Sequence, residues 1–266
     1  MEQARSVLNP SPPTWQEVAV NVTDESRTGP DRPTLPAWGP HMAEFPLRSG
    51  GRISIHDEPP TVDLCLHRPV AEECVMQPHL AAAAAALGIW SGFEALHGGA
   101  FVHSGRAWAL LGDKGAGKST TLGQLALAGC AVLADDLVIW RDGDVLVGPR
   151  CIDLRAEAAG VLGVGRPLGV VGTRERWRLD LPDAPAAVPL AGLIRLDWAE
   201  EATLRPLSVA ERLTLVLASG ALPIPVTPSV SAMELASSCV LSWSRPRDWD
   251  GSEDAIGVLL DCLGSK

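Results

Sequence analysis

Apolar residues along the chain form short runs separated by glycine, proline and charged residues, a pattern typical of a fold that combines strands and helices. Alternating apolar and polar positions predict strands at 52–55 and 62–66, and a further strand is expected at 17–22. The alanine-rich run from 78 to 96 predicts a helix, because alanine is the best helix former and larger apolar residues recur on one side.

The middle of the chain carries the densest apolar pattern. It predicts, in order, strands at 99–103 and 107–111, a helix at 120–128, and strands at 131–134 and 137–140. Strands this close together require hairpins as well as one strand–helix–strand crossover, so the sheet should be mixed. The fold class expected is therefore α/β, with a mixed β-sheet core flanked by helices.

The later part of the chain continues the same alternation. The expected elements are helices at 153–162, 209–219 and 254–263 and strands at 177–179 and 190–196.

The composition divides the chain into three parts. Residues 1–45 are rich in proline and predict a loosely structured arm, and residues 46–75 predict a small β-rich N-terminal layer. Residues 76–266 are expected to form the main domain, which carries the chemistry described below.

One glycine-rich segment stands between a predicted strand and a predicted helix. Gly112–Ser119 reads GDKGAGKS and fits the phosphate-binding P-loop pattern G-x-x-x-x-G-K-[ST] at every fixed position. Backbone N–H groups of such a loop face the phosphates of a nucleotide, so Lys118 should reach the β- and γ-phosphates and Ser119 should ligate Mg²⁺. The residues expected to hold the nucleotide are Gly112, Asp113, Lys114, Gly115, Ala116, Gly117, Lys118, Ser119 and Thr120. A glycine-rich turn without a ligand is the alternative, in a chain that holds 26 glycines.

Three polar features lie at suggestive distances from this loop. Asp135 and Asp136 follow an apolar strand one helix later, where a magnesium-binding carboxylate is expected. Because adjacent residues of a strand point in opposite directions, one carboxylate should face the metal and the other the phosphate acceptor. His97 precedes the hairpin that leads into the loop, and the run 174–178 carries three arginines that could clamp a substrate or form an exposed charged strand.

The charge balance limits the partners. The formal net charge is −10 and the isoelectric point is near 5.0, which argues against nucleic acid or an anionic membrane. The six cysteines contain no C-x-x-C pair, so free thiols are expected. The first residues show no secretory signal, and no apolar run is long enough to span a bilayer, so a cytoplasmic protein is expected.

The segment from His97-Gly98 through the P-loop to Ala134-Asp135-Asp136 resembles the catalytic domain of HPr kinase/phosphorylase. That family carries H-G, G-D-x-G-x-G-K-S and A-D-D at fixed spacing, and the chain follows this order without a gap from His97 to Asp136. The resemblance implies a fold akin to phosphoenolpyruvate carboxykinase and a kinase that uses Mg²⁺ and ATP or another nucleoside triphosphate. It also implies that Asp135 is the base, Asp136 supports Mg²⁺ or that base, and His97 lies close to the phosphates. The family assembles as oligomers, which favours a homo-oligomer.

The chain also departs from that family. The glutamate of a later L-E-I-R-G-like run is absent, and Asp153 and Arg155 stand at the comparable place. Asp153 could replace the glutamate as a metal ligand, and Arg155, Arg176 and Arg178 could contact substrate or phosphate. The chain looks more like the shorter relatives that act on peptide natural products, such as the lasso peptide kinases, and residues 1–75 show no counterpart of the large N-terminal domain.

Three functions are compatible with these residues. The first is a kinase that phosphorylates a serine hydroxyl of a peptide or small protein. The second is a small-molecule hydroxyl kinase on the same core, and the third is a nucleotide-binding regulatory module without catalysis. The paired aspartates favour catalysis, because a module that only binds nucleotide does not need a base.

Overall fold

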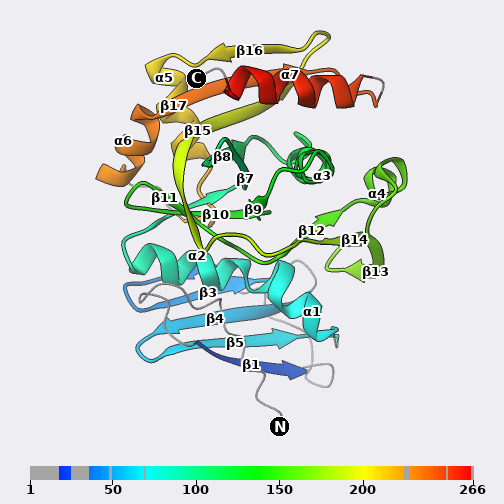
Figure 1. The fold of residues 1–266 in the computed structure, drawn as a ribbon. Coiled ribbons are helices and arrows are strands. Elements are labelled where there is room, and N and C mark those ends of the chain that lie inside the picture. Colours follow the sequence, from blue (N-terminus) through cyan, green and yellow to red (C-terminus); the bar gives the residue numbers. More distant parts are fainter. Residues whose placement is uncertain are drawn as a thin grey trace.

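The structure is a computed structural model that describes residues 18–24, 36–47, 50–68, 70–224, 228–249 and 251–264. Its strands form three sheets, each packed against helices, so the fold is mixed α/β as predicted (Figure 1). A smaller N-terminal sheet lies at one end of the molecule, and the P-loop segment lies in the larger part.

The N-terminal sheet has the strand order β1-β5-β4-β3-β2, with β1 parallel to β5 and the other pairs antiparallel. Its strands are β1 Ala19–Asp24, β2 Ala37–Trp38, β3 Met42–Pro46, β4 Gly51–Asp57 and β5 Pro60–Leu66. The strands expected at 52–55 and 62–66 are β4 and β5, and β1 overlaps the strand expected at 17–22. The sheet thus takes in strands from the predicted arm as well as from the layer predicted at 46–75. Residues 1–17 and 25–35 of the predicted arm lie outside the described residues.

A helical segment separates this sheet from the rest. It consists of α1 Glu72–Cys74, the π-helical turn η1 Val75–His79 and α2 Ala81–Trp90, which packs its buried alanines against the N-terminal sheet (Figure 1). The helix predicted to continue to residue 96 ends at Trp90, so that prediction is wrong at its C-terminal end. Gly92, at φ +83°, turns the chain, and Glu94–His97 form strand β6, whose backbone pairs with β10.

The central sheet has the order β6-β10-β11-β15-β8-β7-β9, and β17 pairs with β15 and β16. Its other strands are β7 Gly99–His103, β8 Arg106–Leu111, β9 Val132–Ala134, β10 Leu137–Arg141, β11 Asp144–Leu146, β15 Ala187–Trp198, β16 Thr203–Pro206 and β17 Cys239–Arg245. β15 runs parallel to β8 and to β17, and the remaining pairs are antiparallel. The prediction of a mixed sheet is confirmed.

This topology places several chain segments at one edge of the sheet. β7 is antiparallel to both β8 and β9, so β8 and β9 run in the same direction and helix α3 (Lys118–Leu127) crosses between them. The carboxyl ends of β8, β9, β15 and β17 therefore lie at the same edge as the start of β7. Ligands in open α/β sheets bind at the carboxyl ends of parallel strands.

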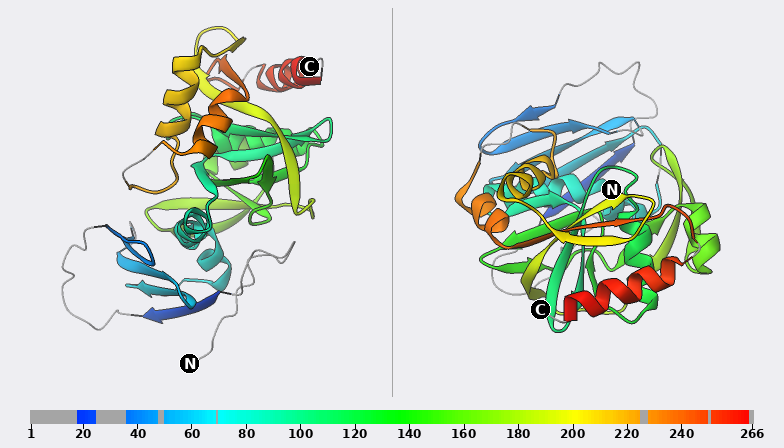
Figure 2. Two further views of the ribbon diagram at one scale, coloured as in Figure 1. Left: turned by 90° about the vertical axis from the view of Figure 1, so that its left-hand side faces the viewer. Right: turned by 90° about the horizontal axis from the view of Figure 1, so that it is seen from above.

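Helices cover both faces of the central sheet. Alternate residues of β8 point to opposite faces, so Ala107 and Ala109 pack in the core with α5 (Val209–Ala218) and α6 (Val230–Ser237). Trp108 and Leu110 pack in the core with α3 and α7 (Ser252–Gly264), which lie apart from α5 and α6 in Figure 2. None of the helices in the described ranges is both long and apolar enough to cross a membrane.

A third, small sheet extends from the central one. It has the order β12-β14-β13, with β12 Cys151–Leu154, β13 Arg166–Val171 and β14 Arg174–Asp180. Helix α4, Ala156–Leu162, lies between β12 and β13 in the chain. The helix predicted from 153 begins later than expected, because Asp153 and Leu154 pair with β14 as part of β12. This pairing brings Asp153 opposite Arg178.

Candidate functional site

The loop between β8 and α3 has the backbone that the glycine pattern requires. Gly112, Gly115 and Gly117 have φ values of +144°, +93° and +86°, a region that residues with a Cβ rarely adopt. The amide of Ala116 donates to the carbonyl of Asp113 over 3.0 Å, and Gly117 is the residue before the first turn of α3. The strand and the helix expected on either side of 112–119 are both present, and the amino end of α3 faces the loop.

The side chain of Lys118 contacts the backbone of this loop. Its Nζ donates to the carbonyl oxygens of Gly112, over 2.8 Å, and Asp113, over 3.3 Å, and the residue is buried. Desolvation lowers its pKa, while Asp136, Asp135 and Asp113 counteract that change. A buried ammonium group held by carbonyls of the loop is placed to transfer its hydrogen bonds to a phosphate.

Ser119 and Asp135 meet at the edge of the sheet. The Ser119 hydroxyl donates to Oδ1 of Asp135 over 3.0 Å, and the backbone N–H of Asp153 donates to Oδ2 over 3.4 Å. Asp135 is only 2% exposed, and burial first and Asp136 second raise its pKa to about 8. A hydroxyl and a carboxylate side by side are oxygen ligands of the kind that Mg²⁺ prefers. Within the described ranges no group of three or more His, Cys, Asp and Glu could hold a metal, but Mg²⁺ at nucleotide sites needs only one or two carboxylates besides phosphate.

The raised pKa of Asp135 predicts how stability depends on pH in magnesium-free buffer. The unfolded carboxyl titrates near 3.8 and the folded one near 8, so the folded state holds the proton more strongly. The stability that this preference contributes is complete below pH 3.8 and is lost as pH rises to 8. Asp135→Asn cannot ionise, so its melting temperature relative to the wild type should increase between pH 5 and pH 8. Melting curves of both proteins over this range test the prediction, which parallel pH profiles would contradict.

Asp136 and His97 lie beside Asp135 and contact each other. Asp136 has φ +68°, and its backbone carbonyl accepts from the Gly98 amide over 3.3 Å and contacts Nδ1 of His97 over 3.1 Å. Desolvation and then Lys118 lower the pKa of His97, which favours the neutral ring. The structure therefore brings together the P-loop segment, the aspartate pair and His97, as the sequence predicted from their spacing.

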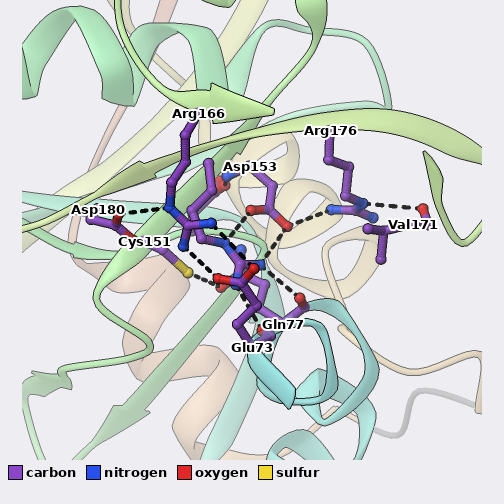
Figure 3. Close-up of polar contacts among 10 residues, drawn as sticks. Glu73, Gln77, Cys151, Asp153, Arg166, Val171, Arg176 and Asp180 are labelled. Atoms are coloured by element: carbon purple, nitrogen blue, oxygen red, sulfur yellow. Dashed lines mark hydrogen bonds and ion pairs between the residues drawn. The ribbon is translucent and has the colours of Figure 1, made fainter. Parts of the chain in front are cut away.

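Asp153 lies at the centre of a buried ion cluster with two arginines. Its Oδ2 accepts from Nη1 of Arg176 over 3.0 Å, and its two oxygens accept from Nε and Nη2 of Arg178 over 2.8 and 3.1 Å. All three side chains are buried, and Figure 3 shows the contact between Asp153 and Arg176. Arg178 also donates to the backbone carbonyls of Glu73 and Gln77, which ties β14 to the helical segment. Both oxygens of Asp153 have arginine partners, so a role as a metal ligand would require it to exchange them.

Two other arginines near this cluster, Arg155 and Arg174, make fewer contacts. Arg155 is exposed just before α4. Arg174 is half-buried, and burial and Arg176 lower its pKa while Asp136 and Asp135 act in the opposite direction. Arg174 donates no side-chain hydrogen bond within the described ranges, and it lies within electrostatic reach of the aspartate pair.

Two further side chains, which no sequence motif indicates, lie beside the loop. Trp198 ends β15 and donates from Nε1 to the carbonyl of Gly115 over 3.1 Å. Arg245 ends β17 and donates from Nη2 to the carbonyl of Ala116 over 3.1 Å and to Oγ1 of Thr121 over 2.8 Å. The available signal was their position at the ends of apolar strands. It could not be used without knowing that these strands lie beside β8.

A comparison with solved structures finds a likeness to the HPr(Ser) kinase/phosphatase from Coxiella burnetii. The identity is 12% and the TM-score is 0.31, over 65% of this chain and 98% of that chain. No family model and no curated protein matches the chain. A similarity this distant shows no function, so the function is inferred from the residues of the site.

Proposed function

We propose that the protein is an ATP- and Mg²⁺-dependent kinase that phosphorylates a serine hydroxyl of a peptide or small protein. The observation that carries the proposal is the contact of Ser119 with the buried carboxylate of Asp135, at the amino end of the helix that follows the glycine loop. Loop, lysine, hydroxyl and carboxylate are the groups that phosphoryl transfer from a nucleoside triphosphate requires, because its catalysis consists mainly of positioning and charge neutralisation.

The residues at this edge have distinct tasks in such a reaction. The loop amides and Lys118 bind the β- and γ-phosphates and neutralise charge on the leaving oxygen. The acceptor hydroxyl attacks the γ-phosphorus, the bond from that phosphorus to the bridging oxygen breaks, and ADP leaves with the electron pair. The hydroxyl proton passes to an aspartate. Ser119 and one carboxylate would hold Mg²⁺, which would supply positive charge to neutralise the phosphates.

The contacts favour a division of labour between the aspartates that exchanges the roles expected from the sequence. Asp135 is buried and hydrogen-bonded to Ser119, which suits the metal side, whereas Asp136 is only partly buried and is accessible to an acceptor. We therefore assign the base to Asp136 and the second metal ligand to Asp135. Arg174 would help to hold the acceptor or the transferred phosphoryl group.

The test is phosphate transfer from ATP labelled at the γ-position, with magnesium, to serine-containing peptides. Each peptide is paired with a version in which alanine replaces the serine, and phosphoserine is located by mass spectrometry. The proposal expects label on the serine peptide and none on its alanine partner. Label only on small hydroxyl compounds would favour a small-molecule kinase, and ATP binding without transfer to any acceptor would favour a binding module.

A further inference from the structure

The indole of Trp198 borders the glycine loop on the side away from the aspartate pair. In the strand order β9-β7-β8-β15-β17, Asp135 follows β9 on one side of the loop, and Trp198 ends β15 on the other. A triphosphate that lies across the loop with its γ-phosphate near the aspartates directs its nucleoside toward β15. Trp198 therefore lies where the base of a bound nucleotide would emerge.

The indole is held firmly in this position. Its Nε1 donates to the carbonyl of Gly115, and the guanidinium of Arg245 covers one of its faces at 4.2 Å from the ring centroid. The fit to the loop is close, because a Cβ on Gly117 would lie 3.0 Å from Cη2 of Trp198 and 2.7 Å from Nη2 of Arg245. Such contacts fix the orientation of the ring before any ligand arrives.

Trp198 nevertheless remains 40% exposed, although a hydrogen bond and a stacked cation fix its ring. Arg245 covers one face of the ring, and the Nε1 edge of the ring faces the loop. Arg245 itself is buried between Trp198 and Trp243, has no carboxylate partner within the described ranges and leaves Nη1 without a hydrogen bond. Burial lowers its pKa to about 10. A buried cation without a counter-ion is costly, and a bound anion nearby would offset that cost.

We propose that Trp198 is the stacking platform for the base of the nucleoside triphosphate, and that Arg245 is the positioning residue that holds the indole and the loop together. This inference rests on the proposed function, since it concerns the nucleotide of that same site. A flat exposed ring stacks on any base, so the platform contributes affinity for a nucleotide over inorganic polyphosphate.

The test compares binding of magnesium–ATP and of magnesium–tripolyphosphate by titration calorimetry. Trp198→Ala should weaken ATP binding about tenfold, the usual loss for one stacked base, and leave tripolyphosphate binding unchanged. Trp198→Phe should keep most of the affinity for ATP. The matched control is Trp38→Ala, which removes a tryptophan from strand β2 of the N-terminal sheet and should change neither.

Two results would overturn the platform and leave the proposed function intact. One is an equal loss of ATP and tripolyphosphate affinity in Trp198→Ala, which would mean that the indole only shapes the loop. The other is wild-type affinity for ATP in that variant. If the wild type bound neither ligand, the glycine loop would not hold phosphates, and the proposed function would fail together with the platform.

Discussion

Asp135→Asn is expected to lower the rate of phosphoryl transfer by at least about 10²-fold, which is the scale for losing one preorganised charged group at a reacting phosphate. The variant keeps the shape of the side chain and can still accept a hydrogen bond from Ser119. It removes the negative charge that would ligate Mg²⁺. The magnesium concentration needed for half-maximal activity should therefore rise. Initial rates measured across a magnesium titration give both quantities.

The matched control is Asp136→Asn, one residue away. If Asp136 is the base, this variant should lose about 10²- to 10⁴-fold in rate, with its magnesium requirement unchanged. A rise in the magnesium requirement for Asp136→Asn but not for Asp135→Asn would restore the assignment expected from the sequence. Wild-type rates in both variants would contradict catalysis by this aspartate pair.

Asp153→Asn is expected to destabilise the fold by about 3–5 kcal/mol, because removal of one partner leaves buried charges uncompensated. The Asp153 carboxylate is fully buried, and the side chains of Arg176 and Arg178 are 10% and 4% exposed. Two guanidinium groups would remain in the interior with a neutral amide between them. The midpoint of urea unfolding, monitored by tryptophan fluorescence, measures the loss.

Glu73→Gln supplies the same chemical change in a neighbouring exposed ion pair. The Glu73 side chain pairs with Arg166, and both are well exposed, so its loss should shift the midpoint far less than that of Asp153→Asn. The backbone carbonyl of Glu73, which accepts from Arg178, is unaffected by this change. Equal shifts for the two variants would show that burial does not increase the contribution of the Asp153 cluster to stability.

Local patterns predicted the elements around the glycine loop well because each has its own signal. The apolar runs at 107–111 and 131–134 and the helical spacing after 120 correspond to β8, β9 and α3. The predicted helix at 78–96 ran too far because Ala95 and Leu96 are strong helix formers by local propensity. Residues Glu94–His97 form a strand because they pair with β10, which is distant in the sequence.

The site was predictable where its residues share one stretch of chain and unpredictable where they do not. His97, the loop and the aspartate pair lie within 97–136, so their spacing and the family motifs that this stretch resembles predicted a common site. The charge run 174–178 left an exposed strand and a substrate clamp as alternatives. The structure shows a strand, with Arg176 and Arg178 turned inward by the pairing of β14 with Asp153. Trp198 and Arg245 reach the loop only through the sheet order.

The most direct measurement of the central claim is calorimetric binding of magnesium–ATP to the wild type and to Lys118→Ala. If Gly112–Ser119 holds the phosphates of a nucleotide, the wild type binds and the variant loses at least about tenfold in affinity, since a hydrogen bond to a charged group is lost. Equal affinity in the two proteins, or no binding by the wild type, would contradict the account.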